Sequence, residues 1–168
     1  MELHTEAGKV RNDELLIVRT FDAPLELVFR AWSSRDHMIR WLGPNEFACT
    51  HLDYDFRPGG KWRGCIVSER YGESWMGGEF KDIEANRRIV YSFAWEGDED
   101  QEHNVETLVT VTFRRDGEKT VQSFHQTPFS SVESRDSHIE GWSQCFDREQ
   151  AYIEALAGNQ PVLQEMNR

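Results

Sequence analysis

Apolar and polar side chains alternate with a period of two over most of the chain between residues 46 and 126. In one run, Tyr91, Phe93 and Trp95 are separated by Ser92 and Ala94. Such alternation is typical of strands that bury one face. Short turn-like links between the runs favour hairpins, and therefore an antiparallel sheet. We expect six strands here, at residues 46–57, 61–70, 74–83, 87–96, 105–115 and 119–126.

Other patterns precede this region. An aliphatic and β-branched run at 14–21 predicts one more strand. A short amphipathic helix is expected to start around Pro24, because proline is tolerated in the first turn. A second short helix should cover 35–42 and end at Gly43-Pro44.

A long helix is predicted after the strands. It should begin at 132–136 and end near 157, because Gly158, Asn159 and Pro161 are helix stop signals. At 1.5 Å per residue it is more than about 30 Å long and can lie across a whole sheet. Its apolar side chains are Ile139, Trp142, Phe146, Tyr152, Ile153 and Leu156.

The order of elements is therefore β-α-α-β6-α, which predicts an α+β fold with helices on one face of an antiparallel sheet. We expect one domain at residues 13–158, a flexible N-terminal tail at 1–12 and a C-terminal tail at 159–168.

The charge balance excludes several partners. The chain carries 19 Lys and Arg against 30 Asp and Glu, a formal net charge of −11. Proteins that bind nucleic acids or anionic lipids rely on a surplus of basic side chains, which this chain lacks, so neither is an expected partner. The longest aliphatic run, 15–18, is far too short to insert in a membrane. The acidic break at 97–103 is expected to be a solvated loop.

The cysteines are Cys49, Cys65 and Cys145, and none of their spacings fits a zinc site. No secretory signal pattern is visible at the N-terminus. We therefore expect reduced thiols, a cytoplasmic protein, and neither a metal nor another cofactor.

Rings form a large share of the apolar side chains. The chain holds 10 Phe, 6 Trp and 4 Tyr residues. Either the core is built from these rings or some of them line a cavity, and the composition alone leaves both readings open.

Three stretches give the chain a resemblance to a known family. They are Arg19–Pro24 with its continuation to Pro44, Asp55–Trp62 (Asp-Phe-Arg-Pro-Gly-Gly-Lys-Trp), and Gly141-Trp142. Together with the element order they resemble the START-like, or SRPBCC, superfamily. Within it, the chain is most similar to the Hsp90 ATPase activator homologue (AHSA1-like) domain family.

The resemblance implies a helix-grip fold, in which a curved antiparallel sheet wraps around the long C-terminal helix. It also implies a cavity between sheet and helix that holds a small hydrophobic or aromatic molecule. It supplies no shared catalytic residues. A chaperone-interacting module is a further alternative, which we expect less because the co-chaperone that names the family has an additional domain. A homodimer is left open.

The candidate ligand-binding residues are the rings of the fifth expected strand and the side chains that would face them. For each ring alone, core packing is the simpler interpretation. Gly141, inside the expected helix, fits either a close approach to the sheet or space for a ligand, and we favour the close approach. The full set is Trp75, Glu79, Tyr91, Phe93, Trp95, Trp142, Cys145, Phe146 and Glu149.

An enzyme of the cyclase or hydrolase type is the second hypothesis. It would need a carboxylate or histidine inside the cavity as acid or base, and no catalytic motif is apparent. Glu79 would qualify only if its face of the strand turned inward, and His51, His125 and His138 are weaker candidates. Arg57-Pro58-Gly59-Gly60 lacks the pattern of a phosphate-binding loop and is expected to be a hairpin turn.

Overall fold

The computed structural model describes residues 11–97 and 105–166, with side chains up to residue 158. The predicted element order is confirmed. The strands are β1 (Leu15–Phe21), β2 (Ala48–Tyr54), β3 (Lys61–Ser68), β4 (Gly72–Glu84), β5 (Arg88–Trp95), β6 (Thr107–Asp116) and β7 (Lys119–Thr127). The helices are α1 (Leu25–Ser33), α2 (Arg35–Trp41) and α3 (Val132–Met166).

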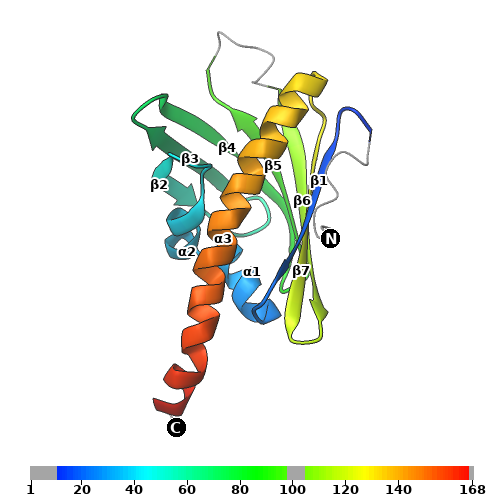
Figure 1. Cartoon of the computed structure of the whole chain (residues 1–168). Coiled ribbons are helices and arrows are strands. Elements are labelled where there is room, and N and C mark those ends of the chain that lie inside the picture. The colour runs from blue at the N-terminus through cyan, green and yellow to red at the C-terminus, as the bar shows by residue number, and fades with distance from the viewer. Residues whose placement is uncertain (1–10, 98–104, 167–168) are drawn as a thin grey trace.

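The strands form one 7-stranded antiparallel sheet in the order β1-β7-β6-β5-β4-β3-β2. Six strands follow one another as a meander, and β1 joins its far edge by pairing Leu15 with Gln126. The sheet curves around α3, which crosses its concave face with α1 and α2 on the same side (Figure 1). This is the helix-grip architecture that the sequence predicts.

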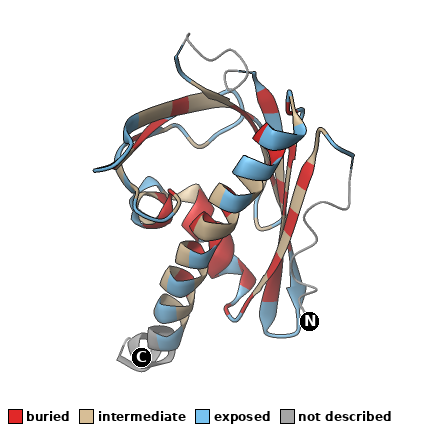
Figure 2. Ribbon diagram, turned by 45° about the horizontal axis from the view of Figure 1, so that its top comes forward, coloured by how far each residue is buried: buried red, intermediate tan, exposed pale blue. Residues whose placement is uncertain are grey.

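Buried residues concentrate on the sheet face that meets the helices (Figure 2). The centre of this core is aromatic. The Trp32 ring lies 5.2 Å from Trp41 and 6.3 Å from both Phe124 and Phe146, between ring centroids. Trp32, Trp41, Phe124 and Phe146 are each at most 2% exposed. The surplus of rings is therefore largely core.

The segment Arg57–Gly60 forms a tight turn between β2 and β3, as expected. The Gly60 N–H donates to the Arg57 carbonyl at 2.8 Å, and Gly59 has φ +84°. A Cβ on Gly60 would lie 2.0 Å from the Asp55 carbonyl oxygen, so only glycine fits.

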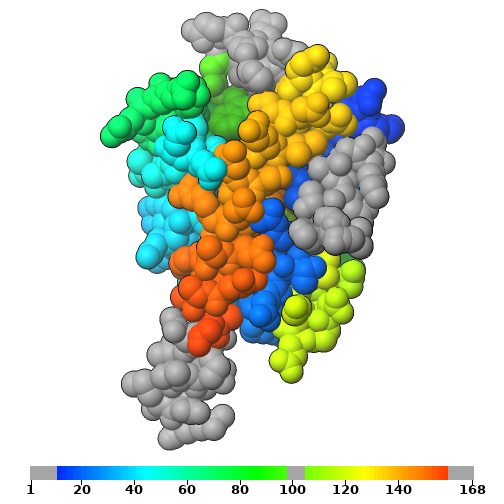
Figure 3. Space-filling view, viewed as in Figure 1, coloured from blue at the N-terminus to red at the C-terminus, as the bar shows by residue number. Residues whose placement is uncertain are grey.

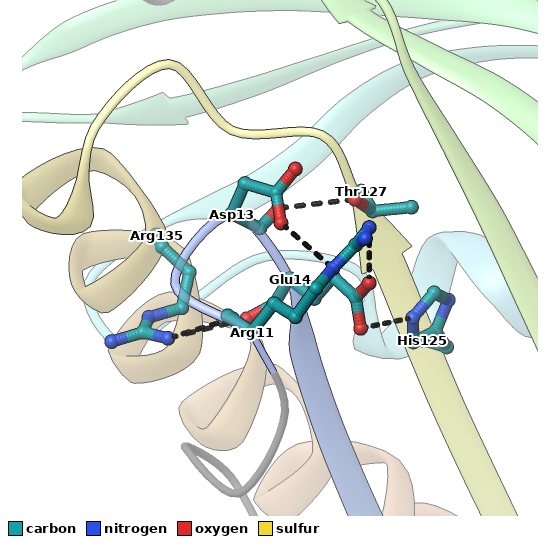
Figure 4. Close-up of polar contacts among 6 residues, drawn as sticks. All are labelled: Arg11, Asp13, Glu14, His125, Thr127 and Arg135. Carbon is teal, nitrogen blue, oxygen red and sulfur yellow. Dashed lines mark hydrogen bonds and ion pairs between the residues drawn. The ribbon is translucent and has the colours of Figure 1, made fainter.

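A polar cluster fastens the start of β1 to β7 and to the first turn of α3 (Figure 4). The Glu14 carboxylate lies 2.7 Å from Arg11 Nη2 and 3.3 Å from His125 Nε2. The hydrogen bond with His125 is the main cause that lowers the pKa of Glu14. Arg135 donates to the Arg11 carbonyl at 3.3 Å, which ties this segment to α3. These contacts give His125 a structural role.

The end of α3 differs from the prediction. The helix continues to Met166 instead of ending near 157, through Gly158 and Pro161. Extending an existing helix adds one hydrogen bond per residue, whereas starting one is costly, so stop residues do not always end a long helix. Residues 1–10 of the N-terminal tail expected at 1–12, and residues 98–103 of the loop expected at 97–103, lie outside the described residues.

Candidate functional site: a cavity between sheet and helix

A cavity of about 690 Å³ lies between β3–β5, the first half of α3 and the loop that follows α2. Figure 3 shows the molecule hollowed there, between the β3–β4 hairpin and α3. We call it the sheet–helix cavity. It is lined by Leu42, Gly43, Pro44, Phe47, Ile66, Glu73, Ser74, Trp75, Met76, Phe93, Trp95, Glu96, Gly97, Ser137, His138, Gly141, Trp142 and Cys145.

Rings from β5 and α3 form its inner corner. The Phe93 ring packs edge-to-face on Trp95 at 5.3 Å and on Trp142 at 5.9 Å, between centroids. Alternation along β5 places Phe93 and Trp95 on the same face of the strand. Trp142 stacks on Phe146, one turn further along α3, at 5.6 Å. The cavity wall is thus an extension of the core, and its geometry is fixed by core packing.

The indole N–H groups of this corner are bonded within the protein. Trp142 Nε1 donates to the Gln126 side-chain oxygen at 2.9 Å. Trp95 Nε1 donates to His138 Nε2 at 2.9 Å, and His138 Nδ1 lies 2.8 Å from the Ser134 carbonyl oxygen. His138 accepts at Nε2 and donates at Nδ1, so its ring is neutral in this arrangement. The rings therefore offer the cavity apolar surface more than hydrogen bonds.

Gly141 lies in the α3 wall of the cavity. The close approach of helix to sheet that we expected at this glycine is wrong. A Cβ built on Gly141 would meet no atom within 4 Å. The helix does not approach the sheet closely at this point, because the sheet–helix cavity lies between them. Glycine in a helix interior costs about 1 kcal/mol relative to alanine. The open space of the cavity explains the presence of Gly141 better than close packing does.

The third wall is the loop after α2, and Arg148 holds it in place. Arg148 Nη1 donates to the carbonyls of Gly43 at 2.8 Å, Pro44 at 3.1 Å and Phe47 at 2.8 Å. The Gly43 N–H also reaches Cys145 Sγ at 3.4 Å. Two residues of α3 thereby fix the loop that closes this side of the cavity.

The sequence candidates fall into three groups. Trp75, Phe93, Trp95, Trp142 and Cys145 line the sheet–helix cavity. Tyr91 borders a separate internal void of about 20 Å³, room for roughly one water, so the deep interior is close to solid.

The other three candidates lie elsewhere. Phe146 and Glu149 are fully buried in the core at 0% exposure. Glu79 is on the outer face of β4, with its side chain 40% exposed and 3.6 Å from Lys81 Nζ. The condition for a buried acid or base at Glu79 is therefore not met.

Sequence reasoning missed the loop wall and the polar rim. Pro44, Phe47, Ser74 and Ser137 line the cavity but were not candidates. The only signal was Gly43-Pro44, which marks a chain reversal after a helix without saying where the loop packs. His51 and His125 contribute nothing to the lining, whereas His138 does.

Burial perturbs two ionisable groups on α3. It raises the pKa of Glu149 to about 8, although hydrogen bonds from Gln122 and Trp32 oppose the shift. Trp32 Nε1 lies 2.9 Å and Gln122 Nε2 3.1 Å from the carboxylate oxygens. Burial also raises the pKa of the Cys145 thiol to about 12, which keeps it protonated and unreactive near neutral pH.

Within residues 11–97 and 105–166, no cluster of three or more His, Cys, Asp or Glu side chains is arranged to hold a metal ion. Within the same ranges, no helix combines the length and apolarity needed to cross a membrane. All three cysteines are free thiols.

Comparison with solved structures gives relatives of the same fold. A protein from Chromobacterium violaceum is 23% identical, with a TM-score of 0.75 over 84% of this chain and 98% of its own. The AHSA1 protein from Silicibacter pomeroyi is 19% identical, with a TM-score of 0.76 over the same shares. An uncharacterized protein from Rhizobium leguminosarum is 25% identical, with a TM-score of 0.70 over 84% of this chain and 94% of its own.

A search of curated proteins found no match. The model of one family, described as activator of Hsp90 ATPase homolog 1-like protein, matches residues 22–154. This match spans every element from α1 to β7 and most of α3, including the walls of the sheet–helix cavity. The chain therefore belongs to the activator of Hsp90 ATPase homolog 1-like family.

Proposed function

We propose that this protein binds a small hydrophobic or aromatic molecule in the sheet–helix cavity. The observation that carries the proposal is the cavity itself: about 690 Å³, with five aromatic residues in its lining. Ligand sites are typically concavities of roughly 300–1,000 Å³ with mainly apolar walls and a few polar groups. Ser74 and Ser137 supply such polar groups here.

Gly141 supports the same proposal from a second direction. A glycine that weakens a helix without serving a close packing contact is expected where a ligand needs the space. Its position in the cavity wall, with no atom within 4 Å of a Cβ, fits that expectation.

Binding is favoured over acid–base chemistry by the state of the ionisable lining residues. Glu96 is paired with Arg63, and Cys145 has a raised pKa. Glu73 accepts a hydrogen bond from Trp75, and both ring nitrogens of His138 are bonded. Glu149, with its raised pKa, lies outside the cavity lining. A catalytic base needs access to its substrate, and none of these groups is presented for it.

The free thiols support a cytoplasmic location, where such groups stay reduced. The family description names an Hsp90 activator. A chaperone-docking role would not require the sheet–helix cavity, so we rank it second.

The test uses N-phenyl-1-naphthylamine, a neutral apolar probe whose fluorescence rises in apolar surroundings. We expect saturable binding to the wild-type protein and clearly weaker binding to Gly141→Leu, whose side chain would project into the cavity. Gly158→Leu is the matched control, because Gly158 lies on the same helix, is exposed and does not line the sheet–helix cavity. Equal binding to all three proteins, or to none, would refute the proposal.

A further inference from the structure

The charged residues that line the sheet–helix cavity are both acidic. Glu73 and Glu96 are among its lining residues, whereas no lysine or arginine of the described chain is. The chain as a whole has a formal net charge of −11. An anion would enter this site against the surrounding field, and a cation would enter along it.

The two carboxylates are not equivalent. Glu96 forms a two-point ion pair with Arg63, at 2.7 Å to Nε and 2.9 Å to Nη2, which neutralises it. Glu73 accepts a hydrogen bond from Trp75 Nε1 at 3.2 Å, and no basic side chain of the described residues is paired with it. Glu73 is therefore the uncompensated charge at the edge of the cavity.

The aromatic lining also suits a cation better than an anion. Ring faces attract positive charge, and tryptophan does so most strongly. Arg63 lies over the Trp75 ring, with Cζ 4.0 Å from its centroid, so β3 and β4 already hold one cation–ring contact within the protein. Trp95 and Trp142 have their N–H donors engaged by His138 and Gln126. Those donors are therefore not offered to an anion.

We infer that the ligand is an organic cation, with an apolar or aromatic body that fills the sheet–helix cavity and an ammonium-type group that lies near Glu73. This rests on the proposed binding function and narrows its ligand class. The body would pack on Phe93 and Trp142, and the charge would lie at the open rim, where it keeps part of its hydration. A site of this kind would discriminate by charge among ligands of equal size.

The test is competition against bound N-phenyl-1-naphthylamine by three compounds with one aromatic body. They are 1-ethylnaphthalene, which is neutral, (1-naphthylmethyl)trimethylammonium, which is a cation, and 1-naphthylacetate, which is an anion. We expect the cation to bind about fivefold or more tightly than the neutral compound, and the anion most weakly. The preference should decline as salt is raised.

Two variants separate the local charge from the charge of the whole chain. Glu73→Gln should remove most of the preference for the cation and leave the affinity of 1-ethylnaphthalene unchanged. Glu118→Gln changes the net charge equally, but Glu118 is exposed in the β6–β7 turn at the other end of the sheet, so the preference should persist (Figure 1).

The outcomes distinguish this inference from the proposal beneath it. If N-phenyl-1-naphthylamine binds but the three compounds compete equally, or the anion competes best, the inference is wrong and the binding function stands. A preference for the cation that survives in Glu73→Gln also overturns it. If no compound and no probe binds, the proposed function itself fails.

Discussion

The carboxyl of Glu149 lies in the aromatic core at 0% exposure, next to Trp32 and Gln122. Removing a carboxylate from water penalises its charged form, which is why burial raises its pKa to about 8. In the unfolded chain the same carboxyl should have its ordinary pKa of 4.5. Between pH 4.5 and about 8, Glu149 is therefore protonated in the native state and ionised in the unfolded state.

This difference predicts how stability depends on pH. The contribution of Glu149 is fully present below about pH 4.5 and is lost as pH rises through about 8, because ionisation in the core costs free energy. Relative to Glu149→Gln, the wild-type protein should lose roughly 2–4 kcal/mol of unfolding free energy between pH 5 and 8. Urea unfolding at a series of pH values measures this.

The control for this experiment is Glu140→Gln, on an exposed position of the same helix. Its stability should follow the wild-type pH profile. Parallel profiles for wild-type and Glu149→Gln proteins would show that Glu149 does not titrate in the core.

Gly141 gives a second prediction at the residue scale, with opposite effects on stability and binding. Gly141→Ala should raise the unfolding free energy by about 1 kcal/mol, because the new Cβ meets no atom and the helix is strengthened. It should also weaken the binding of N-phenyl-1-naphthylamine, because the methyl group projects into the cavity. Gly158→Ala should stabilise similarly without affecting the probe. A Gly141→Ala protein that is destabilised would mean that the helix packs tightly there after all.

At the scale of elements, one side chain of α3, Arg148, holds the loop after α2 against the helix. Arg148 donates to three loop carbonyls, and these groups would lose a partner in Arg148→Met. We expect a loss of about 1–3 kcal/mol in unfolding free energy and weaker probe binding, because the loop wall loosens. Arg114→Met removes the same charge from an exposed position on β6 and should change neither. Unchanged probe affinity in Arg148→Met would mean that the loop is held by other contacts.

The elements themselves were largely predictable, because their periodicities are local. Alternation in β5 and the apolar stripe of α1 identify strand and helix from a few consecutive residues. The end of α3 was not predictable, since helix propagation outweighed the stop residues. The face of Glu79 was not predictable either: alternation groups it with Trp75, but only the tertiary fold decides which face turns inward.

At the scale of the whole molecule, the family and the fold followed from the sequence, whereas the cavity was implied only by the family resemblance and not by any pattern of residues. Whether rings pack together or border a space depends on how far α3 stands from the sheet, and no local pattern encodes that distance. Phe146 and Trp142 are one turn apart on the same helix, yet Phe146 is core and Trp142 lines the cavity. The loop wall joins residues about a hundred positions apart in the chain, such as Gly43 and Arg148.

A ligand should enter the sheet–helix cavity and leave the deep core intact. The indole N–H signals of the six tryptophans, followed by two-dimensional NMR during titration with N-phenyl-1-naphthylamine, test it directly. The signals of Trp95 and Trp142, which line the cavity, should shift, whereas those of Trp32 and Trp41, at most 2% exposed in the core, should stay in place. Shifts confined to Trp32 and Trp41, or no shift at any of the six, would contradict the claim.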